Sequence, residues 1–266
     1  MKAIITAGGW GTRRLPITKA IDKSMLPIGN RPIVDYVVED CIKAGVTEII
    51  FIVSQGSSQL QSYYSRNKDL EEYLQKNGKY NELKQILPLK EITFHYIEQP
   101  NNNKYGTAIP VSLAVKKYDF SDGAVVLMGD DFVYHKNGKS EVENLVKEAS
   151  GESSLLGVKV NINRTHIYGV HRVSKDGNLE SIVEKPKTGT APSNLINVSK
   201  YFMSKNLLDC INNYCDEDVV GEYMITEPIN RYCKDGGIIK VVQASGQYLD
   251  GGTLKGWLEA NNTVCK

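Results

Sequence analysis

The 266-residue sequence has no long apolar run and almost no excess charge of either sign. No apolar stretch approaches the length that spans a bilayer. The 32 Lys and Arg residues nearly balance 31 Asp and Glu residues, which leaves a net charge of +1. Composition therefore provides no whole-chain basic field for non-specific nucleic-acid binding. With 41% hydrophobic residues, the chain is expected to bury a substantial core as one large domain or two small ones.

Cysteine is scarce and poorly spaced for a disulfide framework or a zinc site. The five cysteines are odd in number and form no CxxC pair. The apolar start Met1–Ala7 runs at once into Gly8 and Gly9, which is too short for a secretory signal. We therefore expect buried free thiols and a cytoplasmic protein. The four histidines share no ligand spacing, and no serine lies in a nucleophile elbow.

Short apolar runs alternate with amphipathic stretches, which is typical of an α/β fold. A polar and mostly helical segment at 57–90 reads as an insertion, and Lys175-Asp176-Gly177-Asn178 predicts a hairpin turn. The predicted strands are Ala3–Ala7, Glu48–Val53, Ile92–Ile97, Ala124–Met128, Gly169–Val173, Leu179–Val183 and Ile238–Gln243. The predicted helices are Pro32–Ile42, Gly106–Lys117, Lys205–Asn213, Glu222–Lys234 and one after Gly252.

A glycine-rich, basic loop follows the first strand. Its glycines let backbone N–H groups approach an anion closely. Arg13 could bridge phosphate oxygens in a bidentate manner, and Lys23 could supply a compact positive charge. The glycine spacing is neither that of a Walker A loop nor that of a dinucleotide fingerprint. These residue types alone favour phosphate binding and a tight turn with solvated cations about equally.

Acidic side chains follow the most apolar strand and precede the last predicted helix. Asp130 lies at the carboxyl end of its strand, where open α/β sheets bind ligands. Asp250 in isolation is better explained as a turn or N-cap residue. Mg²⁺ is usually held by a few carboxylates together with substrate phosphates. Asp130, with Asp131 beside it, could therefore contribute to a Mg²⁺ site, whereas Asp250 by its residue type alone is better read as a turn or N-cap residue.

Two further motifs have chemistry suited to a sugar phosphate and to a base. Glu184 could accept hydrogen bonds from sugar hydroxyls while Lys185 holds a phosphate. The amide of Gln99 offers the donor and acceptor that read a pyrimidine edge, and Gly106 could let a base lie against the main chain. Each motif in isolation is more often a solvated strand end or loop.

The string GGWGTRRLPITKAIDKSMLPI closely resembles the signature of the sugar-1-phosphate nucleotidyltransferases, especially the bacterial-type UTP–glucose-1-phosphate uridylyltransferases. Matches at NRPIVDY, YGV, VEKPK and APSNL extend the resemblance along almost the whole chain. It implies a Rossmann-like nucleotidyltransferase fold, with a mixed, mostly parallel central sheet flanked by helices and a small β region for the sugar. We expect a single domain over 1–266, in which 1–135 mainly binds nucleotide and 136–266 mainly binds sugar and completes the metal site.

The resemblance also implies the activity and the site. The expected reaction is Mg²⁺-dependent transfer of a nucleotidyl group from UTP to α-D-glucose 1-phosphate by direct displacement, giving UDP-glucose and pyrophosphate. The implied catalytic residues are Arg13, Lys23 and Lys185. The implied nucleotide-binding residues are Gly8, Gly9, Gly11, Thr12, Arg13, Gln99 and Gly106. The implied sugar-binding residues are Tyr168, Gly169, Glu184 and Lys185, and the implied metal ligands are Asp130 and Asp250.

Some positions depart from the family pattern. Asp22 stands where the family commonly has proline, and the segment 221–227 lacks a glutamine and is shortened. Trp10 either covers the nucleotide or packs against the following helix. A dTTP-dependent glucose-1-phosphate thymidylyltransferase and a catalytically silent sugar-nucleotide-binding homologue remain alternatives. We expect a homo-oligomer, a dimer or tetramer, that binds neither nucleic acid nor a membrane.

Overall fold

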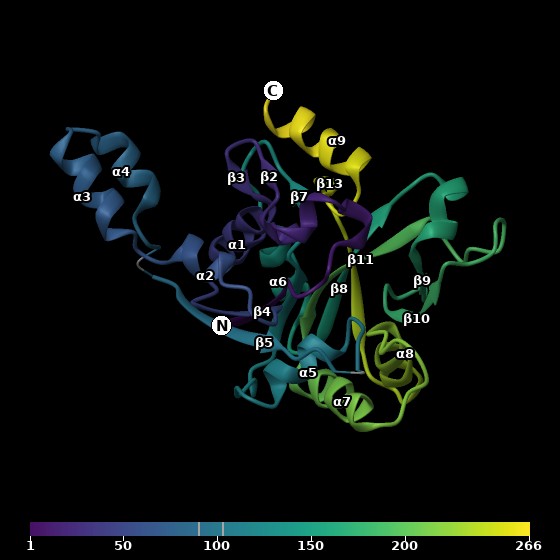
Figure 1. Cartoon of the computed structure of the whole chain (residues 1–266). Helices are drawn as coiled ribbons and strands as arrows, with labels where there is room; N and C mark the ends of the chain where they lie inside the picture. The colour runs from purple at the N-terminus through teal and green to yellow at the C-terminus, as the bar shows by residue number, and fades with distance from the viewer. Residues whose placement is uncertain (90, 103) are drawn as a thin grey trace.

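A nine-stranded sheet forms the centre of the computed structural model, which describes residues 1–89, 91–102 and 104–266 (Figure 1). One half of the sheet is parallel, in the order β6-β1-β4-β5. Parallel strands present their carboxyl ends at one edge of a sheet, so the loops that follow these strands meet there. The four strands are β1 (Lys2–Thr6), β4 (Glu48–Ser54), β5 (Thr93–Gln99) and β6 (Ala124–Met128).

The other half of the sheet begins with β11 (Leu195–Met203), which runs antiparallel to β6. β11 also pairs with β8 (Ser153–Lys159) and with β9 (Gly169–Val173). β9 forms the predicted hairpin with β10 (Leu179–Glu184), and β12 (Ile239–Gln243) lies parallel to β8. The expected α/β fold with a mixed central sheet is therefore confirmed.

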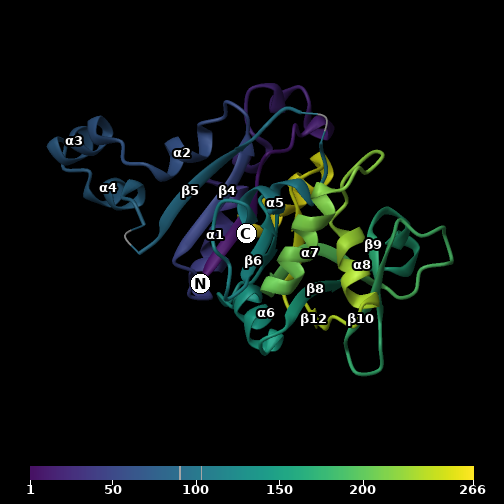
Figure 2. The ribbon, with the colours of Figure 1, turned by 90° about the horizontal axis from the view of Figure 1, so that it is seen from below.

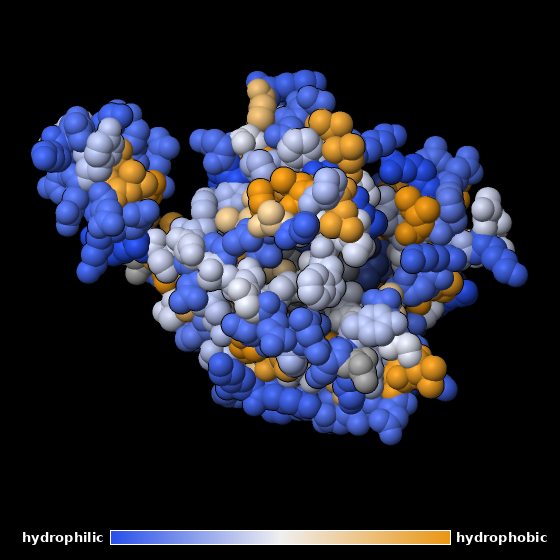
Figure 3. Space-filling model, viewed as in Figure 1, coloured by the Kyte–Doolittle hydropathy of each residue, from blue (hydrophilic) through white to orange (hydrophobic). Residues whose placement is uncertain are grey.

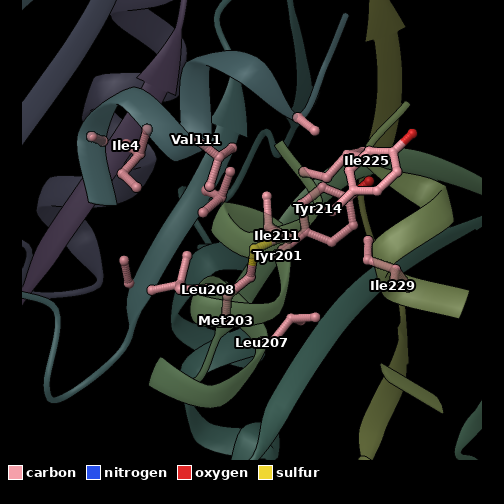
Figure 4. Packing of buried hydrophobic residues seen from close by; sticks show 14 of the residues in the cluster. Ile4, Val111, Tyr201, Met203, Leu207, Leu208, Ile211, Tyr214, Ile225 and Ile229 are labelled. Carbon is pink, nitrogen blue, oxygen red and sulfur yellow. The ribbon is translucent and has the colours of Figure 1, made fainter. Parts of the chain in front are cut away.

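Helices cover both faces of the sheet, so the central strands are buried on both sides. Ile4 on β1 joins the core under α5, α7 and α8, whereas its neighbours Ala3 and Ile5 join the core under α1. Figure 2 shows α5, α7 and α8 together on one side, and Figure 4 shows residues of their core. The helices are α1 (Ile33–Lys43), α5 (Ile109–Val115), α6 (Glu141–Ala149), α7 (Lys205–Asp216), α8 (Thr226–Lys234) and α9 (Leu254–Val264).

The polar segment between β4 and β5 contains three helices, α2 (Gln59–Tyr64), α3 (Lys68–Lys76) and α4 (Tyr80–Ile86). The side chain of Asn67 caps α3 by accepting from Leu70 N–H at 3.1 Å. α3 and α4 project away from the sheet in Figure 1 and form a mostly hydrophilic lobe in Figure 3. Lys90, the last residue of the predicted insertion, lies outside the described residues.

Two expectations are corrected. The helix predicted over Glu222–Lys234 begins only at Thr226, because the backbone of Tyr223 is hydrogen-bonded to the loop after β5 instead of to a helix. Its N–H donates to Tyr105 O and its carbonyl accepts from Ala108 N–H, both at 2.9 Å. The thiols are free, but Cys265 is exposed, so the prediction of buried thiols is wrong there. None of the helices in the described parts of the chain has the length and apolarity to cross a membrane.

Candidate active site

The glycine-rich loop after β1 lies across the carboxyl ends of β4 and β5. A Cβ atom on Gly8 would lie 3.2 Å from Val53 C and 3.4 Å from Gln99 Oε1. A side chain at position 8 would therefore crowd the end of β4, and the close approach brings the Gln99 amide next to the loop. Gly11 has a φ of +63°, and a Cβ there would lie 2.9 Å from Thr18 Cγ2. The loop thus folds back onto the segment that leads to Lys23.

Lys23 connects this loop to the first acidic residue. A Cβ on Gly9 would lie 3.3 Å from Lys23 Nζ, so the loop backbone passes beside the ammonium group. Lys23 Nζ donates to Asp130 Oδ2 at 2.8 Å. The Lys23 side chain is 23% exposed and that of Asp130 is 13% exposed. Both groups are therefore restrained by the fold and still reachable from solvent.

A short strand pair brings the two candidate metal ligands together. β7 (Asp131–Tyr134) pairs antiparallel with β13 (Gln247–Asp250), which sets Asp131 opposite Asp250. Gly251 N–H donates to Asp130 O at 3.0 Å. A Cβ on Gly252 would lie 3.0 Å from Asp250 Oδ1, 3.3 Å from Asp130 Oδ2 and 3.3 Å from Arg13 Nη2. Two carboxylates and a guanidinium from distant parts of the chain therefore converge on one point.

The Asp130 carboxyl is stabilised in its ionised form. Burial alone would raise its pKa, but the ammonium groups of Lys23 and Lys200 and the guanidinium of Arg13 lower the pKa below the ordinary value of 3.8. Asp130 consequently carries a negative charge at neutral pH. It can attract a divalent cation as well as pair with Lys23.

Asp131 belongs to a different, buried network. Lys200, whose side chain is 3% exposed, donates to Asp131 Oδ1 and also to its carbonyl oxygen at 3.2 Å. Tyr248 Oη donates to Asp131 Oδ2 at 2.8 Å, and burial raises the pKa of this phenol well above its usual value. Both carboxylate oxygens of Asp131 are therefore hydrogen-bonded within the protein. Its network ties β11 and β13 to the start of β7, beside Asp130.

The arrangement of Asp130 and Asp250 fits a magnesium ion shared with substrate. Among the described residues, no group of three or more His, Cys, Asp or Glu side chains could hold a metal ion. Mg²⁺ does not require such a group, because it is commonly bound by one or two carboxylates together with substrate phosphates and water. The convergence of Asp130 and Asp250 around Gly252 supplies two carboxylates, so the donor set suits magnesium held jointly with phosphates.

The predicted sugar-side residues lie together at the end of the β9–β10 hairpin. Lys185 N–H donates to Tyr168 O at 2.9 Å, and a Cβ on Gly169 would lie 3.0 Å from Glu184 Oε1. Glu184 and Lys185 are exposed. In the described parts of the chain Lys185 forms no ion pair, so its ammonium is available to an anion. Tyr168 also lines a cavity of about 480 Å³ that Asp250 borders, which links this group to the acidic pair.

Packing against Tyr223 accounts for the glycine at position 106, whether or not a base also contacts it. It has a φ of +127°, and a Cβ there would lie 2.5 Å from Tyr223 O. The close contact joins the loop after β5 to the segment 221–227, in which Glu222 is exposed and Tyr223 buried. Trp10 is 71% exposed, so it does not pack against a following helix, and its indole is free to contact a ligand.

Sequence reasoning missed Lys200, Tyr248 and Gly252. Lys200 lies on β11, whose alternation is broken by a register shift between Asn197 and Tyr201, so its burial was not readable from the pattern. Tyr248 precedes Asp250 by two residues, but only the pairing of β13 with β7 shows that it faces Asp131. The Gly-Gly pair after Asp250 was the one available signal of a close approach.

Comparison with known proteins gives consistent matches. The Nucleotidyl transferase family matches residues 2–266. The chain is 32% identical over 237 residues to UTP–glucose-1-phosphate uridylyltransferase 2 of Staphylococcus saprophyticus, covering 86% of this chain and 80% of the relative. It is 30% identical over 268 residues to UTP–glucose-1-phosphate uridylyltransferase of Pseudomonas aeruginosa, covering 98% and 94%. UTP-bound UGPase from Acinetobacter baumannii is similar in structure, with a TM-score of 0.88, 26% identity and coverage of 98% and 92%.

Proposed function

This chain belongs to the nucleotidyl transferase family, and we propose that it transfers a uridylyl group from UTP to α-D-glucose 1-phosphate, giving UDP-glucose and pyrophosphate. One observation carries the proposal: Arg13, Asp130 and Asp250 converge around Gly252, and Lys23 pairs with Asp130. The names of the relatives from Staphylococcus saprophyticus and Pseudomonas aeruginosa support the choice of substrates.

The nucleotide is bound at the carboxyl edge of the parallel strands. Backbone N–H groups of Gly8, Gly9, Gly11 and Thr12 approach the phosphates, since glycines carry no side chain that would keep an anion away from the backbone. Gln99 reads the pyrimidine edge with its amide, beside Gly8. Uracil and thymine present the same edge to this amide, so UTP is preferred here on the strength of the relatives.

The central chemical problem is the repulsion between two polyanions. Asp130 and Asp250 would hold Mg²⁺, which when bound neutralises part of the triphosphate charge and polarises its phosphoryl oxygens. Arg13 binds the departing pyrophosphate, and Lys23 neutralises charge near the α-phosphorus.

On the other side of the site, Lys185 holds the phosphate of the sugar while Glu184 accepts from its hydroxyls. An oxygen of the sugar phosphate then attacks the α-phosphorus in line, so the α-phosphorus–pyrophosphate bond breaks as the new bond forms. Catalysis of this kind depends on positioning and electrostatics.

The remaining expectations complete the proposal. We assign Mg²⁺ as the divalent metal, a cytoplasmic location in keeping with the free cysteines, and a homo-oligomer, dimer or tetramer. The partners are the small-molecule substrates, without nucleic acid or membrane.

The test is pyrophosphate release by the purified protein with Mg²⁺, measured for UTP, dTTP, ATP and GTP against several sugar 1-phosphates. UTP with glucose 1-phosphate is expected to be fastest. Asp130→Ala is expected to abolish this release, whereas Asp176→Ala in the exposed hairpin turn serves as the matched control. A preference for dTTP would replace the proposal with a thymidylyltransferase. Release with no pair, together with binding of UDP-glucose, would indicate a catalytically silent homologue.

A further inference from the structure

The residue before Lys23 is hydrogen-bonded to the first helix of the insertion. Ser57 Oγ donates to Asp22 Oδ2, and Asp22 N–H donates to Gln59 Oε1 at 3.1 Å. Gln59 Nε2 donates to Ala20 O, also at 3.1 Å. Ser57, just before α2, and Gln59, its first residue, therefore make three hydrogen bonds to the segment that carries Lys23.

Asp22 is the first residue of the turn on which Lys23 lies. Lys23–Met25 forms a single 3₁₀ turn, closed by a hydrogen bond of 2.8 Å from Met25 N–H to Asp22 O. The Asp22 side chain does not cap this turn. It is directed to Ser57 instead, so the position of α2 sets the position of the turn.

The contact with Ser57 also determines how the charges pair. A carboxylate adjacent in sequence to Lys23 could compete with Asp130 for its ammonium group. In the structure the Asp22 carboxylate is satisfied by Ser57, and Lys23 Nζ pairs with Asp130 at 2.8 Å. A proline at position 22 could make neither bond, because it has no N–H and no carboxylate. This connection therefore depends on the departure of the chain from the common family residue.

We propose that Asp22 is a positioning residue, through which Ser57 and Gln59 on the insertion hold Lys23 at its working place beside Asp130. The proposal rests on the proposed function only in giving Lys23 its role near the reacting phosphorus. The hydrogen-bonded connection itself is independent of the reaction. The insertion thereby contributes to the catalytic geometry without touching substrate.

The first experiment compares one matched pair just before α2 and one within it by the rate of UDP-glucose formation. Ser57→Ala and Gln59→Ala are expected to lower kcat about tenfold, since a small misplacement of a charged group is costly, with KM for glucose 1-phosphate changed less than about twofold. Ser58→Ala and Gln61→Ala, whose side chains make no hydrogen bond within the described residues, are expected to match the parent protein. Asp22→Asn, which retains an acceptor for Ser57, is expected to keep most of the activity that Asp22→Ala loses.

A double-mutant cycle separates positioning from a general structural role. In a Lys23→Ala background, Asp22→Ala is expected to cause no further loss of kcat, because the group that it positions is gone. Equal fold-losses in both backgrounds would overturn the proposal, as would equal kcat values for Ser57→Ala and Ser58→Ala in an active parent protein.

Hydrogen exchange tests the connection without turnover. Backbone amides of residues 20–25 are expected to exchange faster in Ser57→Ala than in Ser58→Ala, and equal exchange would overturn the proposal. If the parent protein forms no nucleotide sugar with any substrate pair, the proposed function fails, while this measurement still decides whether α2 holds the Lys23 turn.

Discussion

Lys23 Nζ and Asp130 Oδ2 form an ion pair of 2.8 Å between residues that are 107 positions apart in the chain. The pair links the end of the glycine-rich segment to the end of the central strand β6. Because both side chains are partly exposed, the same groups can turn to substrate phosphates and metal without rearrangement of the backbone. In the proposed reaction, the ion pair preassembles two of the charged groups that are to contact substrate phosphates and metal.

Replacing Lys23 by Ala is expected to lower turnover by about a hundredfold or more, on the scale of losing one charge partner of a transition state. The measurement is the rate of UDP-glucose formation at saturating substrates, with circular dichroism to verify the fold. Lys175→Ala, in the exposed hairpin turn, is the matched control. Near-normal turnover of Lys23→Ala would contradict its placement at the reacting phosphorus.

Tyr248→Phe removes the hydroxyl that donates to Asp131 Oδ2 at 2.8 Å. The loss of one hydrogen bond to a buried charged group is expected to cost about 1.5–3 kcal/mol of unfolding free energy. Because Asp131 adjoins Asp130, a higher Mg²⁺ concentration for half-maximal activity is also expected. Urea unfolding and a magnesium titration check both. Tyr134→Phe is the control, since the Tyr134 hydroxyl makes no hydrogen bond in the described residues, and equal behaviour of the two variants would contradict the prediction.

Gly106→Ala is expected to destabilise the protein more than Gly78→Ala. Both glycines have positive φ, +127° and +69°, but a Cβ at Gly106 would lie 2.5 Å from Tyr223 O, whereas open space surrounds Gly78. Gly78→Ala therefore measures only the cost of placing alanine in a left-handed backbone conformation, about 1–2 kcal/mol. The excess at Gly106 reports its contact with Tyr223 together with the less favourable φ of +127°. Urea unfolding of the two variants measures the difference, and equal losses would show that the contact relaxes without cost.

Glu141 predicts a pH-dependent contribution to stability. Burial alone would raise the pKa of its carboxyl, but hydrogen bonds from Gly246 N–H, Ser245 N–H and His135 lower it below the ordinary value of 4.5. A carboxyl whose pKa is lowered by folding stabilises the protein above its unfolded pKa, and this contribution is lost as the pH falls through the folded pKa.

The difference in unfolding free energy between the parent protein and Glu141→Gln is therefore expected to be largest above about pH 5 and to shrink below about pH 4. Urea unfolding across this range measures it. Glu143→Gln, on an exposed position of the same helix, is the control variant. A difference for Glu141→Gln that stays constant with pH would contradict the assignment of the charge.

Local sequence patterns predicted the strands β1, β4, β5, β6, β9, β10 and β12 and the helices α1, α5, α7, α8 and α9, but they missed α6, β8 and β11. β1, β4 and β6 are continuous apolar runs, and their burial on both faces follows directly from that composition. Arg13, Lys23 and Asp130 were identifiable because each lies within a few residues of a strand end or inside one uninterrupted motif. For such residues the neighbouring sequence alone marks a candidate position.

The tertiary structure alone decided the partners of Asp131 and Gly106, and it supplied the proximity of Asp250 to Asp130 that only the family resemblance had implied. Asp250 meets Asp130 through the pairing of β13 with β7, Asp131 is occupied by Lys200 and Tyr248, and Gly106 rests on Tyr223. Periodicity reports which face of an element is buried, but it does not report which distant element lies against that face. These contacts depend on the order and register of strands far apart in the chain, and those are selected by the packing of the whole molecule.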